Sequence, residues 1–317
     1  MDTLEKVLPR TIFLTQHGSH AYGTNIEGSD YDFKGVCIPT LDYFLGFDKK
    51  FEQLERSANA GHPHDLVVMS LSKFAALAAE CNPNIIEILH VSEADVWHCD
   101  EFGEELRAMR DMFISTKARH TFSGYAHAQL HRIKKHRSWL LSPPKEKPTR
   151  SAFGLSETSK VSKSELGAFD AIIEQKFEVD INKDVLALFL REKQYNAAKT
   201  HWDQYEQWKV KRNDKRAVLE ATFGYDTKHA MHLVRLMRMC KEILSTGKVN
   251  VRREDFEELL GIRFGKWAYD QVIEEAERLD RECGELYKTS KLPHGADRVA
   301  IDAKVVGMTE RYLGRRS

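Results

Sequence analysis

Short apolar segments separated by polar or turn-forming residues characterise the first third of the chain. Five of them have the length and the residue types that are typical of strands: residues 12–14, 30–33, 36–38, 51–55 and 64–69. Residues 30–33 alternate between aspartate and an aromatic residue, so the two faces of that strand should differ in chemistry. Ser70 can cap a helix that runs through residue 80, and Asn84 has capping-box spacing to Glu87 ahead of a second helix.

From residue 100 onward, apolar positions recur at intervals of three and four, which is the spacing of amphipathic helices. We predict long helices over residues 115–140, 183–212, 227–246 and 269–287. Prolines, serines and lysines are concentrated in residues 142–165, which predicts a mobile connection. The pattern therefore indicates an α+β protein, with a small mixed β-sheet and flanking helices in residues 1–100 and a mainly helical domain in residues 101–317.

Composition narrows this picture only slightly. Lysine plus arginine and aspartate plus glutamate each number 48 among 317 residues, so the total charge predicts no particular partner. The five cysteines show no Cys-x-x-Cys spacing, which argues against a disulfide framework or a zinc site and favours reduced thiols. No segment approaches the length and hydropathy of a membrane span, and the first ten residues carry acids and no long apolar core. We therefore expect a cytoplasmic protein without membrane association.

The candidate chemistry lies between residues 17 and 33. Asp30 and Asp32 are two positions apart on a predicted strand, so their carboxylates would point to the same face and repel each other. A cation relieves this repulsion, and Mg²⁺ prefers oxygen ligands shared with substrate phosphates. Gly18 and Ser19 follow the first apolar strand, where a small residue and a hydroxyl can approach an anion closely. Together these residues predict a metal and nucleotide site.

The order of these residues resembles a known pattern. Gly18-Ser19, ten intervening residues and Asp30-x-Asp32 are similar to the signature of the DNA polymerase beta-like nucleotidyltransferase superfamily. The strings over residues 18–24 and 29–36 resemble its RNA-repair branch. The resemblance implies that residues 1–100 form a catalytic domain that transfers NMP from an NTP to an acceptor hydroxyl and releases pyrophosphate. The alternative interpretation is a solvated turn that carries acidic residues.

The same resemblance implies a third carboxylate on a neighbouring strand. Asp65 is our candidate, because residues 65–71 and the segments after them resemble the corresponding stretch of the RNA-repair branch. Glu52 and Glu55 are rival candidates. Asp65 could also be an ordinary turn residue.

In the implied mechanism, three carboxylates bind two Mg²⁺ ions, with Mn²⁺ as an alternative ion. Asp30 and Asp32 bridge the ions, and Asp65 helps to activate the acceptor hydroxyl for attack on the α-phosphorus. Gly18 and Ser19 hold the β- and γ-phosphates. No covalent enzyme intermediate is needed.

Basic residues concentrated in one segment predict where other phosphates could bind. No aspartate or glutamate occurs between Asp111 and Glu146, whereas lysines, arginines and histidines are frequent there. Within this segment, the surroundings of Tyr125 and Gln129 resemble the same family, which implies contact with a base or a ribose. The alternative is a basic helix face exposed to solvent, with Tyr125 in the core.

The predicted helix over residues 227–246 carries an apolar stripe and a separate face of hydrogen-bond donors. Lys228, His232 and Arg235 fall on that second face at helical spacing. Residues 224–236 resemble a block of the same family, which implies that these three side chains contact the triphosphate or the acceptor phosphate. The alternative is an ordinary amphipathic helix with a hydrated basic side.

The predicted partners are an NTP and RNA, with an RNA 3′ end as acceptor and tRNA as one candidate. Aromatic residues over 195–208 could stack on single-stranded bases, although their spacing along one helical stripe favours core packing. Two alternatives stay open: a protein adenylyltransferase of the antitoxin-like type, and a non-catalytic nucleotide- or RNA-binding module. The basic segment favours RNA, and intact Asp30 and Asp32 favour an enzyme.

Overall fold

The computed structural model describes residues 3–57, 61, 64–158, 161–174, 182–212 and 214–315. The chain separates into two compact units. Unit 1 comprises Met1–Ile133 together with Asp226–Ser317, and unit 2 comprises Lys134–Tyr225. These units do not coincide with a division at residue 100, so the assignment of residues 1–100 as the catalytic domain stays a prediction.

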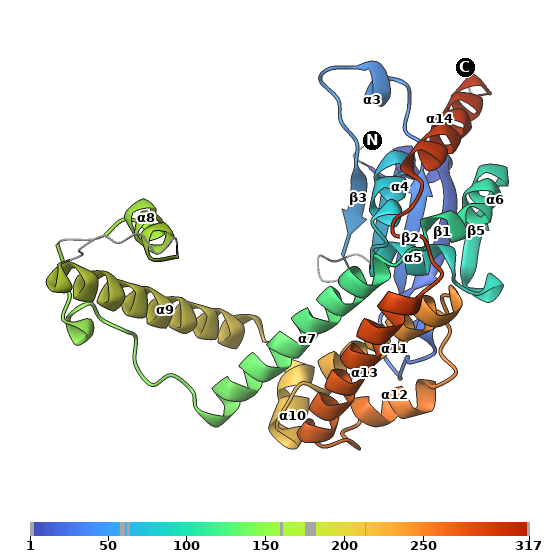
Figure 1. Cartoon of the computed structure of the whole chain (residues 1–317). Helices are drawn as coiled ribbons and strands as arrows, with labels where there is room; N and C mark the ends of the chain where they lie inside the picture. Colours follow the sequence, from blue (N-terminus) through green and yellow to red (C-terminus); the bar gives the residue numbers. More distant parts are fainter. Residues whose placement is uncertain are drawn as a thin grey trace. The chain divides into compact units, whose positions relative to one another are not determined.

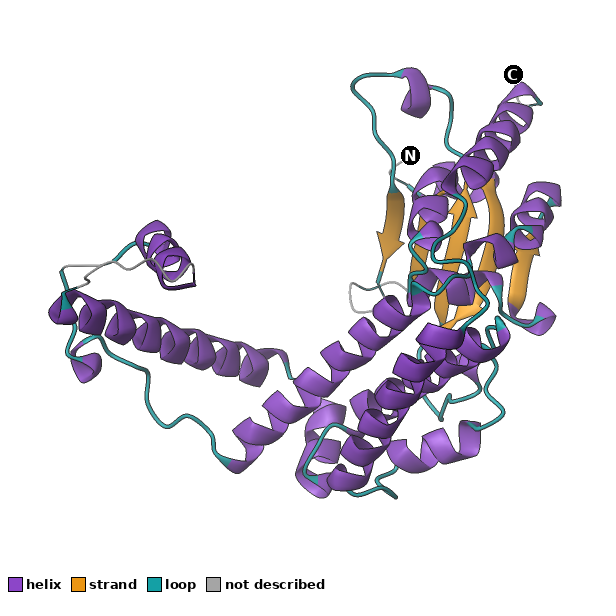
Figure 2. Ribbon diagram, viewed as in Figure 1, coloured by secondary structure: helices purple, strands orange, loops and turns teal. Residues whose placement is uncertain are grey.

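Unit 1 contains a five-stranded mixed sheet (Figures 1 and 2). Its strands are β1 (Thr11–His17), β2 (Asp32–Cys37), β3 (Gln53–Arg56), β4 (Asp65–Ser70) and β5 (Val96–Cys99). Their order is β3-β4-β2-β1-β5, with β2 and β4 parallel and the other neighbours antiparallel. A short sheet followed by helices confirms the predicted α+β class.

Helices make up the rest of unit 1. Before the long helices come α1 (Leu4–Val7), α2 (Gly18–Tyr22), α3 (Asp42–Leu45), α4 (Leu71–Ala79), α5 (Pro83–Leu89), α6 (Glu101–Ala108) and the 3₁₀ turns η1 (Leu8–Arg10), η3 (Glu93–Asp95) and η4 (Arg110–Phe113). After residue 226 come α11 (Thr227–Thr246), α12 (Phe256–Arg263), α13 (Tyr269–Thr289) and α14 (Arg298–Gly314). Helix α7 (Ala118–Leu141) belongs to unit 1 as far as Ile133.

Local sequence explains where several of these helices begin and end. The Ser70 side chain accepts a hydrogen bond from the Lys73 amide and caps α4, as predicted. Asn82, and not Asn84, caps α5, because Pro83 occupies the first helical position, where the missing amide hydrogen has no cost. Asp226 caps α11, and Gly247 ends it in the left-handed conformation with φ +72°.

The core of unit 1 joins the sheet to the C-terminal helices. The apolar stripe predicted on α11 is buried, since Ala230, Leu233, Met237, Cys240 and Leu244 are each at most 2% exposed. Helix α11 packs against α12 and α13. Helix α11, which begins 128 residues after the last strand ends, thus belongs to the same compact unit as the sheet.

Unit 2 is helical in its described residues. It contains η5 (Ser151–Phe153), α8 (Lys163–Glu174), α9 (Lys183–Lys211) and α10 (Asp214–Phe223). Trp139 is 4% exposed, lies 5.3 Å from the Trp208 ring and donates a 2.8 Å hydrogen bond to His201. Tyr205 and Trp208 of α9 also contact Trp139 and are half-buried, which favours packing within this unit over base stacking.

Two predictions about strand boundaries need correction. Residues 30 and 31 are not part of a strand, because β2 begins at Asp32. The Tyr31 carbonyl still accepts a 3.2 Å hydrogen bond from the Asp65 amide, so the pairing with β4 starts one residue before the strand itself. Strand β3 begins at Gln53, two residues later than predicted. Among the described residues, no helix combines the length and the hydropathy that crossing a bilayer would require.

Candidate active site

The turn from β1 into α2 is built around Gly18. This residue has φ +69°, a conformation that favours glycine. A Cβ atom at position 18 would lie 2.1 Å from Oδ2 of Asp32, so any larger residue would collide with that carboxylate. Ser19 follows in the first turn of α2. The Gly-Ser pair therefore lies directly against Asp32, 14 residues further along the chain.

Asp32 and Asp65 are neighbours across the parallel pair β2 and β4. They occupy the same register, each as the first residue of its strand. Burial raises the pKa of Asp32, the charge of Asp65 raises it further, and Asp30 adds a smaller contribution. Asp30 is exposed and precedes β2 by two residues. Asp65 and Asp30 are thus both close enough to Asp32 for their charges to raise its pKa.

The rivals to Asp65 lie elsewhere. Glu52 forms a 2.8 Å ion pair with Lys73, and Glu55 accepts a hydrogen bond from Gln53. Strand β3, which carries Glu55, is the edge strand on the far side of β4 from β2. This geometry favours Asp65 over both glutamates as the partner of Asp32.

Lys34 and Lys228 are the two cations whose charges act on the Asp32 carboxylate. Both lower the pKa of Asp32 and so offset part of the effect of burial and of Asp65. Lys228 is exposed in the first turn of α11. Lys34 lies on the same face of β2 as Asp32, and its ammonium donates a 3.3 Å hydrogen bond to the Asn84 carbonyl. Burial lowers the pKa of Lys34.

Arg235 and His232 occupy a different environment from Lys228. Arg235 is 1% exposed, and its Nη1 donates a 2.6 Å hydrogen bond to Oε1 of Glu87. His232 lies 3.2 Å from the other terminal nitrogen of Arg235, and burial lowers the pKa of His232 to about 3. Arg235 therefore pairs with a buried carboxylate inside unit 1, and we assign neither Arg235 nor His232 to the phosphates.

Glu87 connects the same interior to β1 and α2. Its Oε2 accepts a 2.6 Å hydrogen bond from the Tyr22 hydroxyl and lies 3.3 Å from Nε2 of His17. The Arg235 guanidinium lies 3.7 Å from the centre of the Tyr22 ring. Burial alone would raise the pKa of Glu87, but Arg235, His17 and Tyr22 together outweigh it and hold that pKa well below its usual range. These contacts fix both ends of the turn that carries Gly18.

Sequence reasoning missed Glu87 and Lys34 as parts of this region. The usable indication for Glu87 was a single carboxylate inside the apolar string Ile-Ile-Glu-Ile-Leu over residues 85–89. A charge in a buried string requires a buried partner. Nothing in the sequence identified Arg235 as that partner.

Tyr125 and Gln129 lie on α7. Tyr125 is 38% exposed and its hydroxyl accepts a 3.2 Å hydrogen bond from Asn82. Gln129 is 7% exposed and accepts a 3.5 Å contact from Arg132. Their predicted contacts with a base or a ribose stay predictions.

The basic character of the 112–145 segment is partly offset by acids from other parts of unit 1. Lys117 forms a 2.6 Å ion pair with Glu80, and Arg119 forms a 3.0 Å ion pair with Asp280. An excess of cations in a stretch of sequence is therefore not the same as an excess on the surface.

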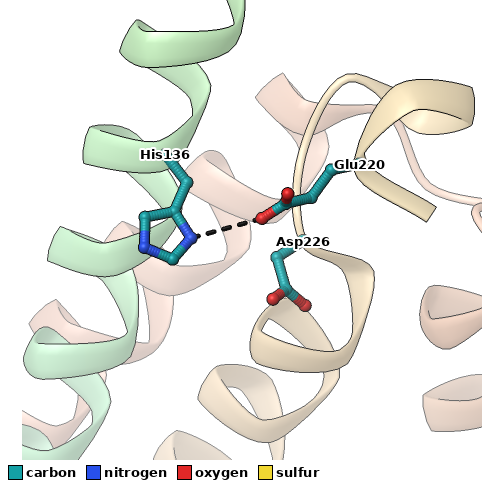
Figure 3. Close-up of side chains that lie close together, drawn as sticks. All are labelled: His136, Glu220 and Asp226. Atoms are coloured by element: carbon teal, nitrogen blue, oxygen red, sulfur yellow. Dashed lines mark hydrogen bonds and ion pairs between the residues drawn. The ribbon is translucent and has the colours of Figure 1, made fainter. Parts of the chain in front are cut away.

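His136 and Glu220 form a polar pair within unit 2 (Figure 3). Nδ1 of His136 lies 3.2 Å from Oε1 of Glu220, and Oε2 of Glu220 accepts a 2.6 Å contact from Arg212. Because Arg212 already balances the carboxylate, we interpret the contact between His136 and Glu220 as a structural hydrogen bond and not as a metal site.

Comparison with known proteins agrees with the geometry of the first half of the chain. Residues 2–141 match the sequence profile of the RNA repair pathway DNA polymerase beta family, RlaP. This match confirms the resemblance to the RNA-repair branch of the polymerase beta-like nucleotidyltransferases.

A protein of Enterobacteria phage T4, described as an uncharacterized 38.9 kDa protein in nrdC-mobD intergenic region, is 29% identical over 127 residues. That match spans 38% of this chain and 38% of the phage protein. No solved structure matches.

Proposed function

We propose, from the match of residues 2–141 to a polymerase beta-like family of RNA repair, that this protein transfers NMP from an NTP to the 3′ hydroxyl of RNA. The observation that carries the proposal is the position of Asp32. It shares a register with Asp65 and lies against the backbone of Gly18. Carboxylates and an anion-binding turn at one place are what a triphosphate with its divalent ions requires.

The donor set fits Mg²⁺ or Mn²⁺. Asp30, Asp32 and Asp65 offer only oxygen ligands, and burial together with the charge of Asp65 raises the pKa of Asp32, an effect that a bound divalent cation would reverse. When bound there, such ions would neutralise phosphate charge and lower the pKa of the acceptor hydroxyl.

We assign phosphate binding and proton transfer to residues of this chain. We assign Gly18 and Ser19 to the β- and γ-phosphates, because a residue without a side chain allows the backbone amides to approach them. Lys228 supplies a point charge for the same phosphates. Asp65 accepts the proton of the acceptor hydroxyl, whose oxygen bonds to the α-phosphorus while the bond to the bridging oxygen of pyrophosphate breaks.

The test is incubation with each labelled NTP, Mg²⁺ and an RNA pool that includes tRNA. Asp32→Asn and Asp65→Asn should each lower NMP transfer by several orders of magnitude. The carboxylates act as one unit, so the loss of one of them removes most of the contribution of the others. Glu52→Gln and Glu55→Gln are matched controls that remove a carboxylate from the rival positions and should retain transfer. Transfer by Asp32→Asn at the wild-type rate would overturn the proposal.

The same assay separates the alternatives. Label that appears on a protein, with RNA retention that does not change between two salt concentrations, would indicate a protein adenylyltransferase. Binding of NTP and RNA without transfer would indicate a non-catalytic binding module. Loss of transfer on chelation, restored by Mg²⁺ or Mn²⁺, identifies the metal requirement.

A further inference from the structure

Five aromatic rings lie in series beside the candidate carboxylates. His20 stacks on Tyr31 at 4.2 Å between ring centres, and Tyr31 contacts His64 edge-on at 5.7 Å. His64 contacts Phe33 at 5.5 Å, and Phe33 contacts Trp97 at 4.8 Å. We call these five residues the aromatic row.

Much of the aromatic row is open to solvent. Trp97 is 63% exposed and Tyr31 is 44% exposed, and His64 is also exposed. Contiguous aromatic rings that are exposed to water form an apolar patch, and such patches often mark a site that a ligand or partner covers. The aromatic row is therefore a candidate binding surface.

The chain places the aromatic row next to the proposed chemistry. Tyr31 lies between Asp30 and Asp32 in the sequence, and His64 directly precedes Asp65. Because side chains alternate along a strand, Phe33 lies on the face of β2 opposite to Asp32. Tyr31 and His64 directly precede the first residues of β2 and β4, so they bring the aromatic row to the end of the sheet at which Asp32 and Asp65 lie. A ligand that covers the rings would reach the carboxylates around that end of the sheet.

We propose that the aromatic row stacks the unpaired bases at the 3′ end of the acceptor RNA and so delivers the terminal hydroxyl to the carboxylates. This inference rests on the function proposed above and names the acceptor as single-stranded at its end. Every base has a face that can stack, so such a surface binds single strands with little regard to sequence.

Two features favour an RNA strand over one nucleotide or a protein segment. Five rings in series, from α2 to the edge strand β5, extend further than the single base of an NTP needs. Arg252 lies at the His20 end, where its Nη1 donates a 3.0 Å hydrogen bond to the His20 carbonyl and its Nη2 lies 3.7 Å from Oδ1 of Asp95, and its side chain is 51% exposed. A cation beside stacking rings matches a phosphate backbone that accompanies bases.

The experiment measures binding of an unstructured RNA of roughly 12 nucleotides by fluorescence anisotropy, with Mg²⁺ and without NTP. Trp97→Leu keeps apolar bulk but removes the ring, and it should weaken binding by about 5- to 100-fold. Its salt dependence should not change, because no cation is lost. Trp97→Phe, which keeps a ring, should restore most of the affinity. Phe264→Leu is the matched control, because Phe264 is 52% exposed but lies outside the aromatic row.

Two further measurements complete the test. Arg252→Gln should reduce the slope of log affinity against log salt by about one. The same sequence as a blunt duplex should bind more weakly to the wild type and should be insensitive to Trp97→Leu. NMP transfer by the wild type is recorded in parallel, so that failure of the proposed function is seen separately from failure of the binding surface.

The inference is overturned if the wild type does not bind the single strand, if Trp97→Leu binds it as the wild type does, or if the duplex binds equally well. It is also overturned if Trp97→Leu changes the oligomeric mass, because a second copy would then be the occupant of the aromatic row.

Discussion

Arg235 on α11 donates a 2.6 Å hydrogen bond through Nη1 to Oε1 of Glu87 on α5, 148 residues earlier in the chain. Both side chains are almost fully buried, at 1% and 0% exposure. Tyr22 and His17 contact the same carboxylate, so this pair joins the C-terminal helices to the turn that carries Gly18. The bond therefore connects the interior of unit 1 to the candidate active site.

Breaking this pair should destabilise unit 1. Glu87→Gln and Arg235→Met each leave one buried group without its charged partner, and each should cost about 3–5 kcal/mol of unfolding free energy. Urea unfolding followed by circular dichroism measures the loss. Lys288→Ala, which removes the exposed Lys288–Glu285 pair, is the control and should stay within about 0.5 kcal/mol of the wild type. Equal effects of Glu87→Gln and Lys288→Ala would contradict a structural role for the buried pair.

Acid should destabilise the protein through buried histidines. Burial lowers the pKa of His17 from 6.5 to about 4, with Lys34 contributing in the same direction. Between these two pH values His17 is protonated in the unfolded chain but not in the folded chain, so the free energy of unfolding rises with pH across this window. Above pH 6.5 the contribution of His17 no longer changes with pH. Glu87, whose pKa is also lowered, extends the loss below its unfolded value of 4.5.

Urea midpoints recorded from about pH 7 to about pH 4 test this expectation, and His17→Gln should flatten the slope by about one proton. Asp32 acts in the opposite direction, because its raised pKa makes the folded state bind the proton more tightly as the pH falls. A wild-type profile that is flat between pH 6.5 and pH 4 would contradict the assignment of His17.

Alanine substitutions at Gly18 and Gly28 form a matched pair. Both glycines have a left-handed φ, +69° and +73°, so an alanine at either position carries the same backbone strain of about 1 kcal/mol. Only at position 18 does the new Cβ meet the Asp32 carboxylate, because nothing lies within 4 Å at position 28.

Gly18→Ala should therefore abolish NMP transfer and cost more unfolding free energy than Gly28→Ala, which should retain transfer. Thermal unfolding and the transfer assay measure the two effects. Equal stability and equal activity of the two variants would show that the close approach to Asp32 has no consequence.

Lys228 and Arg235 should respond differently to substitution, although both fall on one predicted helix face. Lys228→Ala should raise the KM for NTP by about 10- to 100-fold, because a charged hydrogen bond to phosphate is lost, and should leave the unfolding free energy unchanged. Lys248→Ala, which removes another exposed lysine two residues beyond the end of α11, is the control. Steady-state kinetics with varied NTP gives the answer. An unchanged KM in Lys228→Ala would remove Lys228 from the phosphate-binding set.

The sequence determined the local features of this protein. The Ser70 cap and the apolar stripe of α11 follow from short-range chemistry, and the structure contains them as predicted. The strand bounds were predicted only approximately, and β5 was not predicted. The order of Gly18, Ser19, Asp30 and Asp32 was sufficient to indicate the family whose profile residues 2–141 match, because such a motif is compact in the chain.

Only the tertiary structure decided which distant residues meet. Asp65 shares a register with Asp32 because β2 and β4 are parallel, and strand pairing over 33 residues has no periodicity in the sequence. Lys228 and Arg235 look equivalent on a helix drawn by itself, yet packing against α5 buries one beside Glu87 and leaves the other exposed. The aromatic row likewise joins four separate segments. Long-range contacts depend on how whole elements pack, and no local pattern of residues encodes that packing.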